Sequence, residues 1–421
     1  MKRLDERLIF WFASAAAIAV PFVVAAGRDG FRIGKEIVFV AAGAIVAGLM
    51  LAAALAIAPP FRAMWRERRT EVVLAAAVVI WTAIATFFSI QQTLSLVTLS
   101  WVVAAAALFL AVLGGGLESG LAMANVAILP AAVNALVAMS QRLGWWQPVH
   151  LDPDLPARIR TAGFVGNPND LSGYLLLPLI ASVSIAIVTR DRWRWFYGAI
   201  AIILAGGIAA SETITAMAAL LAGLFAMALL VSRRKALGLG VALLASVAVA
   251  SYLQLPLVDR LFSVFGQASA GDLLAATSSR TQAWLIAWRM FLDHPVAGVG
   301  PGCYGLMYLA YKMSVAKSHP EFLASPENYG EAHNDHLQTL AVSGVPGYLL
   351  LVAALLFLGS VSFRQTAEGT RGRFAKLFAL PAAVSLAVVM AGQFPLELGA
   401  PLIVILYLCA LTLAWRTRCE S

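Results

Sequence analysis

About 12 apolar segments, each roughly as long as a bilayer is thick, most constrain what this chain can fold into. Hydrophobic residues make up 61% of the sequence and charged residues 12%, whereas about a quarter of the residues in a soluble domain are charged. The apolar segments are continuous and lack the alternation that marks the strands of a membrane barrel. The sequence therefore predicts an all-α polytopic membrane protein with about 12 transmembrane helices.

The expected spans follow the apolar segments along the chain. They cover residues 8–26, 37–58, 71–89, 94–113, 119–140, 171–189, 195–211, 213–231, 236–255, 337–360, 375–392 and 398–415. The first span follows a short basic stretch, as a signal peptide does, but a multi-span chain usually retains such a segment as its first helix. We expect helices 1–9 within residues 1–255, a large loop at 256–336, and helices 10–12 within 337–421.

The distribution of positive charge predicts the orientation in the membrane. Alternating loops on one side contain 19 of the 30 Lys and Arg residues, and the loops on the other side contain 11. Because cytoplasmic loops are enriched in Lys and Arg, the first side and both termini are predicted to be cytoplasmic. Two polar loops, at 142–170 and 256–336, then face the exterior, which is the periplasm in a double-membraned bacterium. The net charge of +8 indicates contact with membrane lipids and not with nucleic acid.

The loop at 256–336 is the only long polar interruption between the apolar segments, and it contains four of the five histidines. These are His294, His319, His333 and His336. ATP and nucleotide sugars are cytoplasmic, so an exterior site must use a substrate that carries its own activation energy. The sequence contains no Walker A motif for binding nucleotide phosphates.

The shorter loop contains two arginines before a glycine- and asparagine-rich turn. Arg158 and Arg160 precede this turn, and the next apolar segment begins near Leu171. Asn169 or Asp170 is expected to cap that helix. A helix N-terminus beside an arginine is suited to binding phosphate. Alternatively, the arginines contact lipid headgroups and the turn is only a helix cap.

The large loop supplies a further arginine, Arg280, at the start of a predicted helix. If Arg280 lies across the site from Arg160, the two guanidinium groups can neutralise a diphosphate without a metal. The alternative is a simple salt bridge between Arg280 and either Asp272 or Asp293.

The end of the large loop contains two histidines, His333 and His336, which would share one face of a helix. A neutral imidazole with a pKa near 6.5 is the usual general base. A metal site would need further ligands, for which Glu331, Asp335 and Asp293 are candidates. Because the stretch lacks the ligand spacing of a zinc or magnesium site, we expect no metal. Capping or packing remains the other interpretation of the pair.

Two glycine-rich stretches have structural interpretations. Residues 298–302 follow no strand and include a proline, so we expect a turn between two helices and not a phosphate-binding loop. Residues 343–347 lie early in a predicted membrane helix and are expected to form a kink or a point of close packing.

Several motifs together resemble one family. They are Arg160-Thr-Ala-Gly-Phe-Val-Gly-Asn-Pro-Asn169, Arg280 with Trp284, Asp293-His-Pro-Val-Ala-Gly-Val-Gly-Pro-Gly302, His333-Asn334 with Leu337, and Gly344-Val-Pro-Gly347. In this order, and with a large exterior loop before the tenth span, the sequence resembles the superfamily of O-antigen ligases and O-antigen polymerases. The resemblance extends from about residue 158 to 350, and the earlier helices match only in character.

The resemblance implies a metal-independent, cofactor-free, inverting glycosyltransferase in the bacterial inner membrane. Such enzymes transfer a glycan from undecaprenyl diphosphate at the periplasmic face. By similarity, Arg160 and Arg280 would stabilise the diphosphate and His333 would be the general base. Further contacts with substrate are expected from Arg158, Asn169, Asn334 and His336.

Three functions follow from these observations in order of preference. An O-antigen ligase would use lipid A-core as the acceptor of the glycan. A polymerase of O-antigen or exopolysaccharide would perform the same chemistry on a lipid-linked glycan. A transporter is disfavoured because its charged groups would lie at mid-membrane, whereas Glu212 and Glu397 lie near the predicted exterior ends of their spans.

Overall fold

The computed structural model describes residues 2–25, 30–55, 67–148, 155–232, 234, 256–364 and 369–416, and every regular element in these ranges is a helix. Within these ranges, nine helical segments are long and apolar enough to cross a membrane, and two shorter apolar helices accompany them. The helices that contain them are α1 (Lys2–Ala19), α2 (Gly30–Leu55), α4 (Arg69–Phe87), α5 (Gln92–Gly116), α6 (Asn125–Leu143), α7 (Pro168–Val188), α8 (Trp193–Ala210), α9 (Ile214–Val231), α16 (Asp335–Arg364), α17 (Gly369–Val389) and α18 (Gly399–Ala414). The prediction of an all-α polytopic membrane protein is therefore confirmed. The expected span at 236–255 lies outside the described residues, so the count of 12 stays a prediction.

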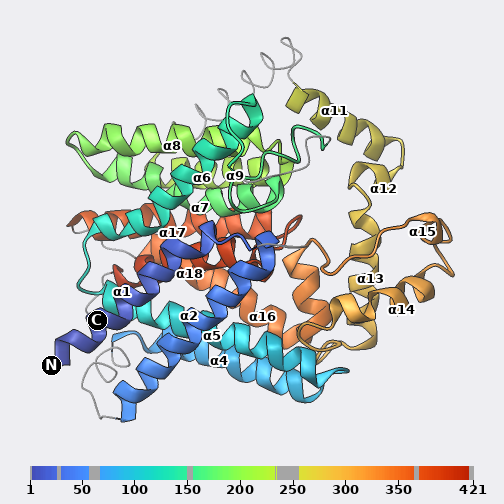
Figure 1. The fold of residues 1–421 in the computed structure, drawn as a ribbon, viewed down its shortest axis with the longest axis horizontal. Helices are drawn as coiled ribbons and strands as arrows, with labels where there is room; N and C mark the ends of the chain where they lie inside the picture. The colour runs from blue at the N-terminus through green and yellow to red at the C-terminus, as the bar shows by residue number, and fades with distance from the viewer. Residues whose placement is uncertain are drawn as a thin grey trace.

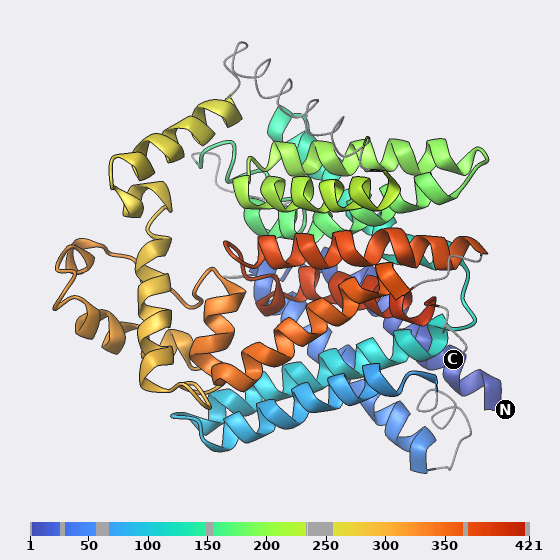
Figure 2. The same ribbon diagram turned by 180° about the vertical axis from the view of Figure 1, so that it is seen from behind.

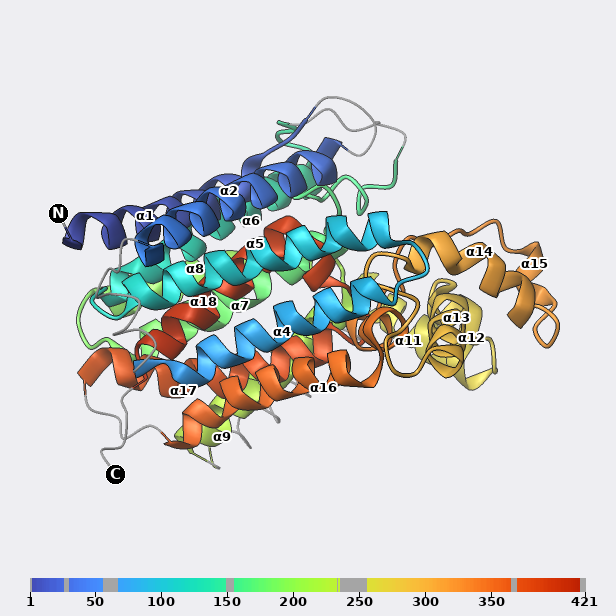
Figure 3. The ribbon, with the colours of Figure 1, turned by 90° about the horizontal axis from the view of Figure 1, so that it is seen from below.

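A polar layer of shorter helices lies at one end of this bundle (Figure 1). We use this name for α11 (Pro256–Ser269), α12 (Leu273–Ala276), α13 (Arg280–Asp293), α14 (Tyr304–Val315) and α15 (Glu321–Ala324). Figure 3, seen from below, places the start of α1 and the end of α18 at the opposite end of the bundle. The large loop predicted from the sequence therefore forms a separate layer beside the membrane helices.

The centre of the bundle is formed by α7, α17 and α18. Of the apolar window in α7, 83% is buried, and nearly every residue of α18 is buried. A helix that is apolar on all sides can face either lipid or other helices, and the burial of α7 and α18 shows that these two lie among other helices. From behind, α17 and α18 lie between the green layer of α7, α8 and α9 and the blue-to-cyan pair of α4 and α5 (Figure 2). Small residues allow close approach, as where Gly223 of α9 meets Ser385 of α17.

The end of the bundle opposite the polar layer is held together by arginines. Arg416, after α18, forms an ion pair of 2.8 Å with the buried Glu71 of α4. Arg68 donates to the carbonyl of Ala414 at 2.7 Å, and Arg371 of α17 donates to the carbonyls that follow α5. These residues belong to the loops in which the sequence concentrates positive charge, and they lie together at one end.

A kink in α16 receives the glycine-rich turn that joins α13 to α14. At the kink, Gly344 has φ 65° and ψ −169°. The amide of Val345 donates to the carbonyl of Pro295 at 2.9 Å, and the amide of Val299 donates to the carbonyl of Ala341 at 2.8 Å. The predicted turn and the predicted point of close packing are thus both confirmed, and they pack against each other.

Replacing Gly344 with alanine should destabilise the protein. A Cβ atom at this position would lie 2.0 Å from the carbonyl oxygen of Val296. The positive φ alone costs an alanine roughly 1–3 kcal/mol. We expect Gly344→Ala to lower the midpoint of thermal unfolding in detergent. Gly48→Ala is the control, because Gly48 lies inside α2 with no atom near its Cβ position, and it should leave the midpoint unchanged or raise it. Equal midpoints for the two variants would contradict this account of the kink.

Candidate functional site

The N-terminus of α7 is capped earlier than the sequence suggested. The helix begins at Pro168, and the side chain of Asn167 accepts a hydrogen bond of 2.8 Å from the amide of Asn169. The prediction that Asn169 or Asp170 caps a helix beginning near Leu171 is therefore wrong. Proline suits the first position of a helix because its fixed φ is already helical and its missing N–H is not needed there.

The two arginines of the shorter loop have different partners. Arg158 donates from Nη2 to the side-chain oxygen of Asn169 at 2.9 Å, and the hydroxyl of Thr213 lies 3.2 Å from the same oxygen. Arg160 donates from Nε to the carbonyl of Leu155 at 3.1 Å. Arg158 and Asn169 are thus bonded to each other, whereas the hydrogen bond of Arg160 lies within its own loop and leads to neither Arg280 nor His333.

Two buried amide side chains of α6 hold this loop in place. The oxygen of Gln141 accepts from the backbone amides of Ala162 and Gly163, at 3.0 Å and 2.8 Å. The oxygen of Asn134 accepts from the amide of Phe164 at 2.9 Å. In the sequence, the sign of this support is the presence of two amide side chains within an otherwise apolar helix. Buried amide side chains are normally hydrogen-bonded, and here their partners are backbone amides of the loop.

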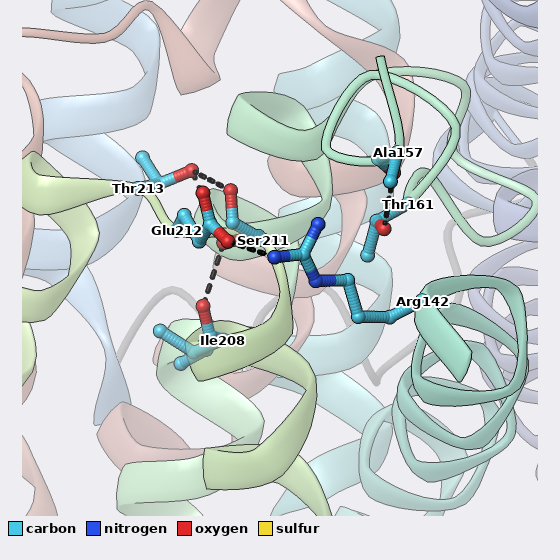
Figure 4. A network of polar contacts seen from close by, with 7 residues as sticks. All are labelled: Arg142, Ala157, Thr161, Ile208, Ser211, Glu212 and Thr213. Carbon is cyan, nitrogen blue, oxygen red and sulfur yellow. Dashed lines mark hydrogen bonds and ion pairs between the residues drawn. The ribbon is translucent and has the colours of Figure 1, made fainter. Parts of the chain in front are cut away.

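The end of α6 is joined to the turn between α8 and α9 (Figure 4). Arg142, in the last turn of α6, forms an ion pair with Glu212. The hydroxyl of Ser211 donates to that of Thr213 at 3.1 Å, and Thr161 bonds back to its own loop. The partial negative charge at a helix C-terminus favours an arginine there. The ion pair of Arg142 joins the end of α6 to the turn between α8 and α9.

Arg280 lies at the first position of α13 and contacts a turn from the other half of the bundle. Its Nη1 donates to the carbonyl of Gly392, between α17 and α18, at 2.9 Å. The two acidic residues considered as alternative partners have contacts elsewhere. Asp293 pairs with Arg289 at 3.0 Å, and Asp272 accepts from a backbone amide of α12. Arg280 therefore points toward the membrane helices.

His333 lies just before α16 and not on it. The side chain of Asn334 accepts from the amide of Leu337 at 3.0 Å and donates to the carbonyl of Ala391 at 3.0 Å. This cap begins the helix after the histidine, which has φ 50°. The prediction that His333 and His336 share a helix face is therefore wrong. His336 is on the helix.

The two imidazoles have different surroundings. The ring of His336 has Nε2 2.9 Å from the carbonyl of Ala387 in α17. The ring of His333 has two aromatic neighbours, and both of their rings are almost perpendicular to it. Its centroid is 5.3 Å from that of Tyr329 and 4.6 Å from that of Phe394. These two aromatic contacts restrict the orientation of the His333 ring.

Charged groups from distant parts of the chain surround His333. Arg32, near the start of α2, forms an ion pair of 2.6 Å with Glu331. The guanidinium charges of Arg280 and Arg32 act both on His333 and on Asp170 in the first turn of α7. Arg280, His333 and the first turn of α7 therefore belong to one electrostatic site.

Burial and charge together change two pKa values at this site. Burial, followed by the positive charges of Arg280 and Arg32, lowers the pKa of His333 to about 4. Burial, followed by the negative charge of Glu331, raises the pKa of Glu397 to about 7, although Arg32 opposes this. His333 is therefore a neutral imidazole at pH 7, and Glu397 is a carboxyl group that titrates near that pH.

The acidic residues considered as metal ligands are separated by their own contacts. Glu331 bonds to Arg32, Asp335 accepts from the amide of Leu396, and Asp293 bonds to Arg289. Within the described part of the chain, no group of three His, Cys, Asp or Glu side chains is arranged to hold a metal ion.

Sequence reasoning missed three contributors to the site. They are Arg32, its partner Glu331 as an ion-pairing residue, and the turn at 390–398 between α17 and α18. For Arg32 a local signal existed, because Arg32 and Glu36 form a charged pair one turn apart at the edge of an apolar span. The turn has no such signal, since its contacts with Arg280 and Asn334 use backbone carbonyls.

Comparison with protein families gives a match at residues 199–352, to the family described as O-antigen ligase. The matched range includes most of α8, all of α9 and the polar layer, and α16 as far as residue 352, and so it contains Arg280 and His333. Comparison with curated proteins finds no match. The resemblance noted in the sequence motifs is confirmed by the family match. The chain is therefore a multi-pass membrane protein in which residues 199–352 match the family described as O-antigen ligase.

Proposed function

We propose that this protein transfers a glycan from undecaprenyl diphosphate to an acceptor hydroxyl at the periplasmic face of the bacterial inner membrane. The observation that carries the proposal is a partly buried, neutral imidazole whose pKa is lowered by its burial and by a nearby arginine. Arg280 and His333 lie in the family-matched range, and the charge of Arg280 acts directly on the imidazole. The dense positive charge at the opposite end of the bundle supports a cytoplasmic location for both termini.

The chemistry needs only groups that the site contains. His333 accepts the proton of the acceptor hydroxyl as its oxygen attacks the anomeric carbon of the donor sugar. The bond between that carbon and the diphosphate oxygen breaks, and undecaprenyl diphosphate leaves with the bonding electrons. Direct displacement inverts the configuration at the anomeric carbon. Arg280 stabilises the negative charge that grows on the leaving group.

The electrostatics of the site support a base that becomes stronger when the donor binds. Two positive charges disfavour protonation of His333 in the free protein. A bound diphosphate would offset those charges and raise the pKa of His333. The imidazole is therefore neutral before the reaction and gains affinity for a proton when the donor is present.

The shorter loop is proposed to bind the donor diphosphate from the other side. The hydrogen bond of Arg160 uses Nε, and the guanidinium fork is suited to bidentate contact with phosphate. Arg158 and Asn169 act as a bonded pair at the N-terminus of α7, where backbone amides favour an anion. Asn334 and His336, which follow His333 in the sequence, are proposed to contact the acceptor.

Lipid A-core is the acceptor that we propose, which makes the protein an O-antigen ligase. Polymerisation of O-antigen or exopolysaccharide uses the same residues and differs only in the acceptor. The two activities are distinguished by the product of the transfer assay below.

Replacing either central residue should abolish most of the transfer. Removal of a general base costs about 10²–10⁴ in rate, and removal of a preorganised charge at the leaving group costs about 10²–10³. We expect His333→Gln and Arg280→Gln to lose transfer by these factors. The assay uses purified protein, undecaprenyl-diphosphate glycan, lipid A-core and EDTA, without nucleotide.

The matched control is Arg289→Gln, which removes an arginine from the same helix as Arg280 and should transfer at the normal rate. Product on lipid A-core identifies a ligase, whereas longer chains on the lipid carrier identify a polymerase. A folded His333→Gln protein with normal transfer would show that His333 is not the base.

The pH dependence of transfer should differ from that of an ordinary histidine base. The pH dependence of kcat/KM reports the pKa values of the free protein, in which the pKa of His333 is about 4. Activity should therefore be constant from pH 7 to 5.5 and fall only as the pH approaches 4. A histidine with a pKa of about 6.5 would be about 90% protonated at pH 5.5. Arg280→Gln removes a positive charge, so its residual activity should fall at a higher pH.

A further inference from the structure

One guanidinium group joins the first half of the bundle to the segment that contains His333. Arg32 of α2 bonds to Glu331 through Nη2 and to Glu36 through Nε, both at 2.6 Å. Glu36 is one turn further along the same helix, whereas Glu331 is far away in the sequence. Arg32 also lies outside the range 199–352 that matches the O-antigen ligase family.

The residues around Glu331 form a short segment without helical structure. We call residues 329–334 the His333 segment. Its backbone is held at Ala332, whose amide donates to the buried Gln338 at 2.8 Å, and at the helix cap Asn334. Between these two points His333 has a positive φ of 50°. A residue with a side chain keeps that conformation only where its surroundings hold it. Glu331 supplies a side-chain attachment to α2.

We propose that Arg32 is a positioning residue for His333: its ion pair with Glu331 fixes the His333 segment, so that α2 completes the glycan-transfer site. This inference rests on the function proposed above for His333. Arg32 is bonded to two carboxylates and does not take the place of Arg280 at the diphosphate. It acts through Glu331 and through its charge.

The ion pair is better suited to positioning than to stabilising the fold. The side chain of Arg32 is 39% exposed, and pairs of that exposure add little to the free energy of unfolding. Its charge nevertheless reaches His333. The charged groups that act on the imidazole are Arg280 of α13 and Arg32 of α2, and the Tyr329 ring packs against it. Glu331 pairs with Arg32, and both of these charges act on Glu397 before α18.

The first test measures transfer by Arg32→Gln, Glu331→Gln and the double variant. A small misplacement of a reacting group can cost about 100-fold, and we expect each single variant to lose about tenfold or more in kcat. If the residues act through one ion pair, the double variant loses no more than the worse single variant. Arg289→Gln again serves as the matched control, because it breaks an ion pair in the polar layer. Normal transfer by Arg32→Gln or Glu331→Gln, or losses that multiply in the double variant, would overturn the proposal.

The second test needs no turnover. Diethylpyrocarbonate modifies neutral imidazole, and mass spectrometry of the His333 peptide gives the modification rate at each pH. In the wild-type protein the rate should stay constant down to about pH 5, since the pKa of His333 is about 4. In Arg32→Gln the midpoint should rise by about one pH unit, the usual effect of one nearby charge. Glu331→Gln loosens the segment but keeps the positive charge, so its midpoint should not rise.

This pair of results distinguishes a specific charge from general loosening. Equal upward shifts in Arg32→Gln and Glu331→Gln would mean that both variants merely hydrate the site, and an unchanged profile in Arg32→Gln would mean that its charge does not reach His333. Either outcome overturns the proposal. If the wild-type protein transfers no glycan but the predicted titration differences appear, the function proposed for the site is wrong and the link between Arg32 and His333 holds.

Discussion

The close approach of two backbones at the kink of α16 fixes the polar layer on the bundle. A Cβ atom on Gly298 would lie 2.3 Å from the carbonyl carbon of Val342, so no other residue type fits there without displacement. Trp81 of α4 adds a hydrogen bond of 2.9 Å to the carbonyl of Ser343. Since α13 ends just before this contact and α16 passes through it, the contact determines how Arg280 lies relative to the membrane helices.

The fold was largely predictable because long apolar segments have few alternatives in a membrane. Backbone groups in lipid must bond within their own segment, so an apolar stretch of about 20 residues becomes a helix. The turn at 298–302 and the kink at 344 were predictable for a similar reason, because glycine marks backbone conformations that other residues avoid. Helix ends were less predictable. At α7 a proline, and at α16 the side chain of Asn334, moved the boundary.

The site was only partly predictable, because its contacts join distant parts of the sequence. Arg280 and His333 stood out as polar residues of chemically useful types, and the structure places them in one electrostatic site. Arg160 stood out equally, yet its hydrogen bond lies within its own loop. The ion pair of Arg32 with Glu331 joins residues about 300 positions apart, and no local pattern indicates which of the exterior charges will meet. The family motifs identify site residues only within about residues 158–350, and Arg32 lies outside that segment.

The turn between α17 and α18 contributes to the site mainly through its main chain. The carbonyls of Met390, Ala391 and Gly392 accept hydrogen bonds from Asp335, Asn334 and Arg280 respectively. Every amino acid supplies the same carbonyl group, so relatives of this protein can exchange many of the side chains in this turn during evolution. The number of residues in the turn cannot change as easily. An inserted or deleted residue would shift all three carbonyl acceptors at once. We therefore expect relatives of this protein to differ in this turn by substitutions and not by insertions or deletions.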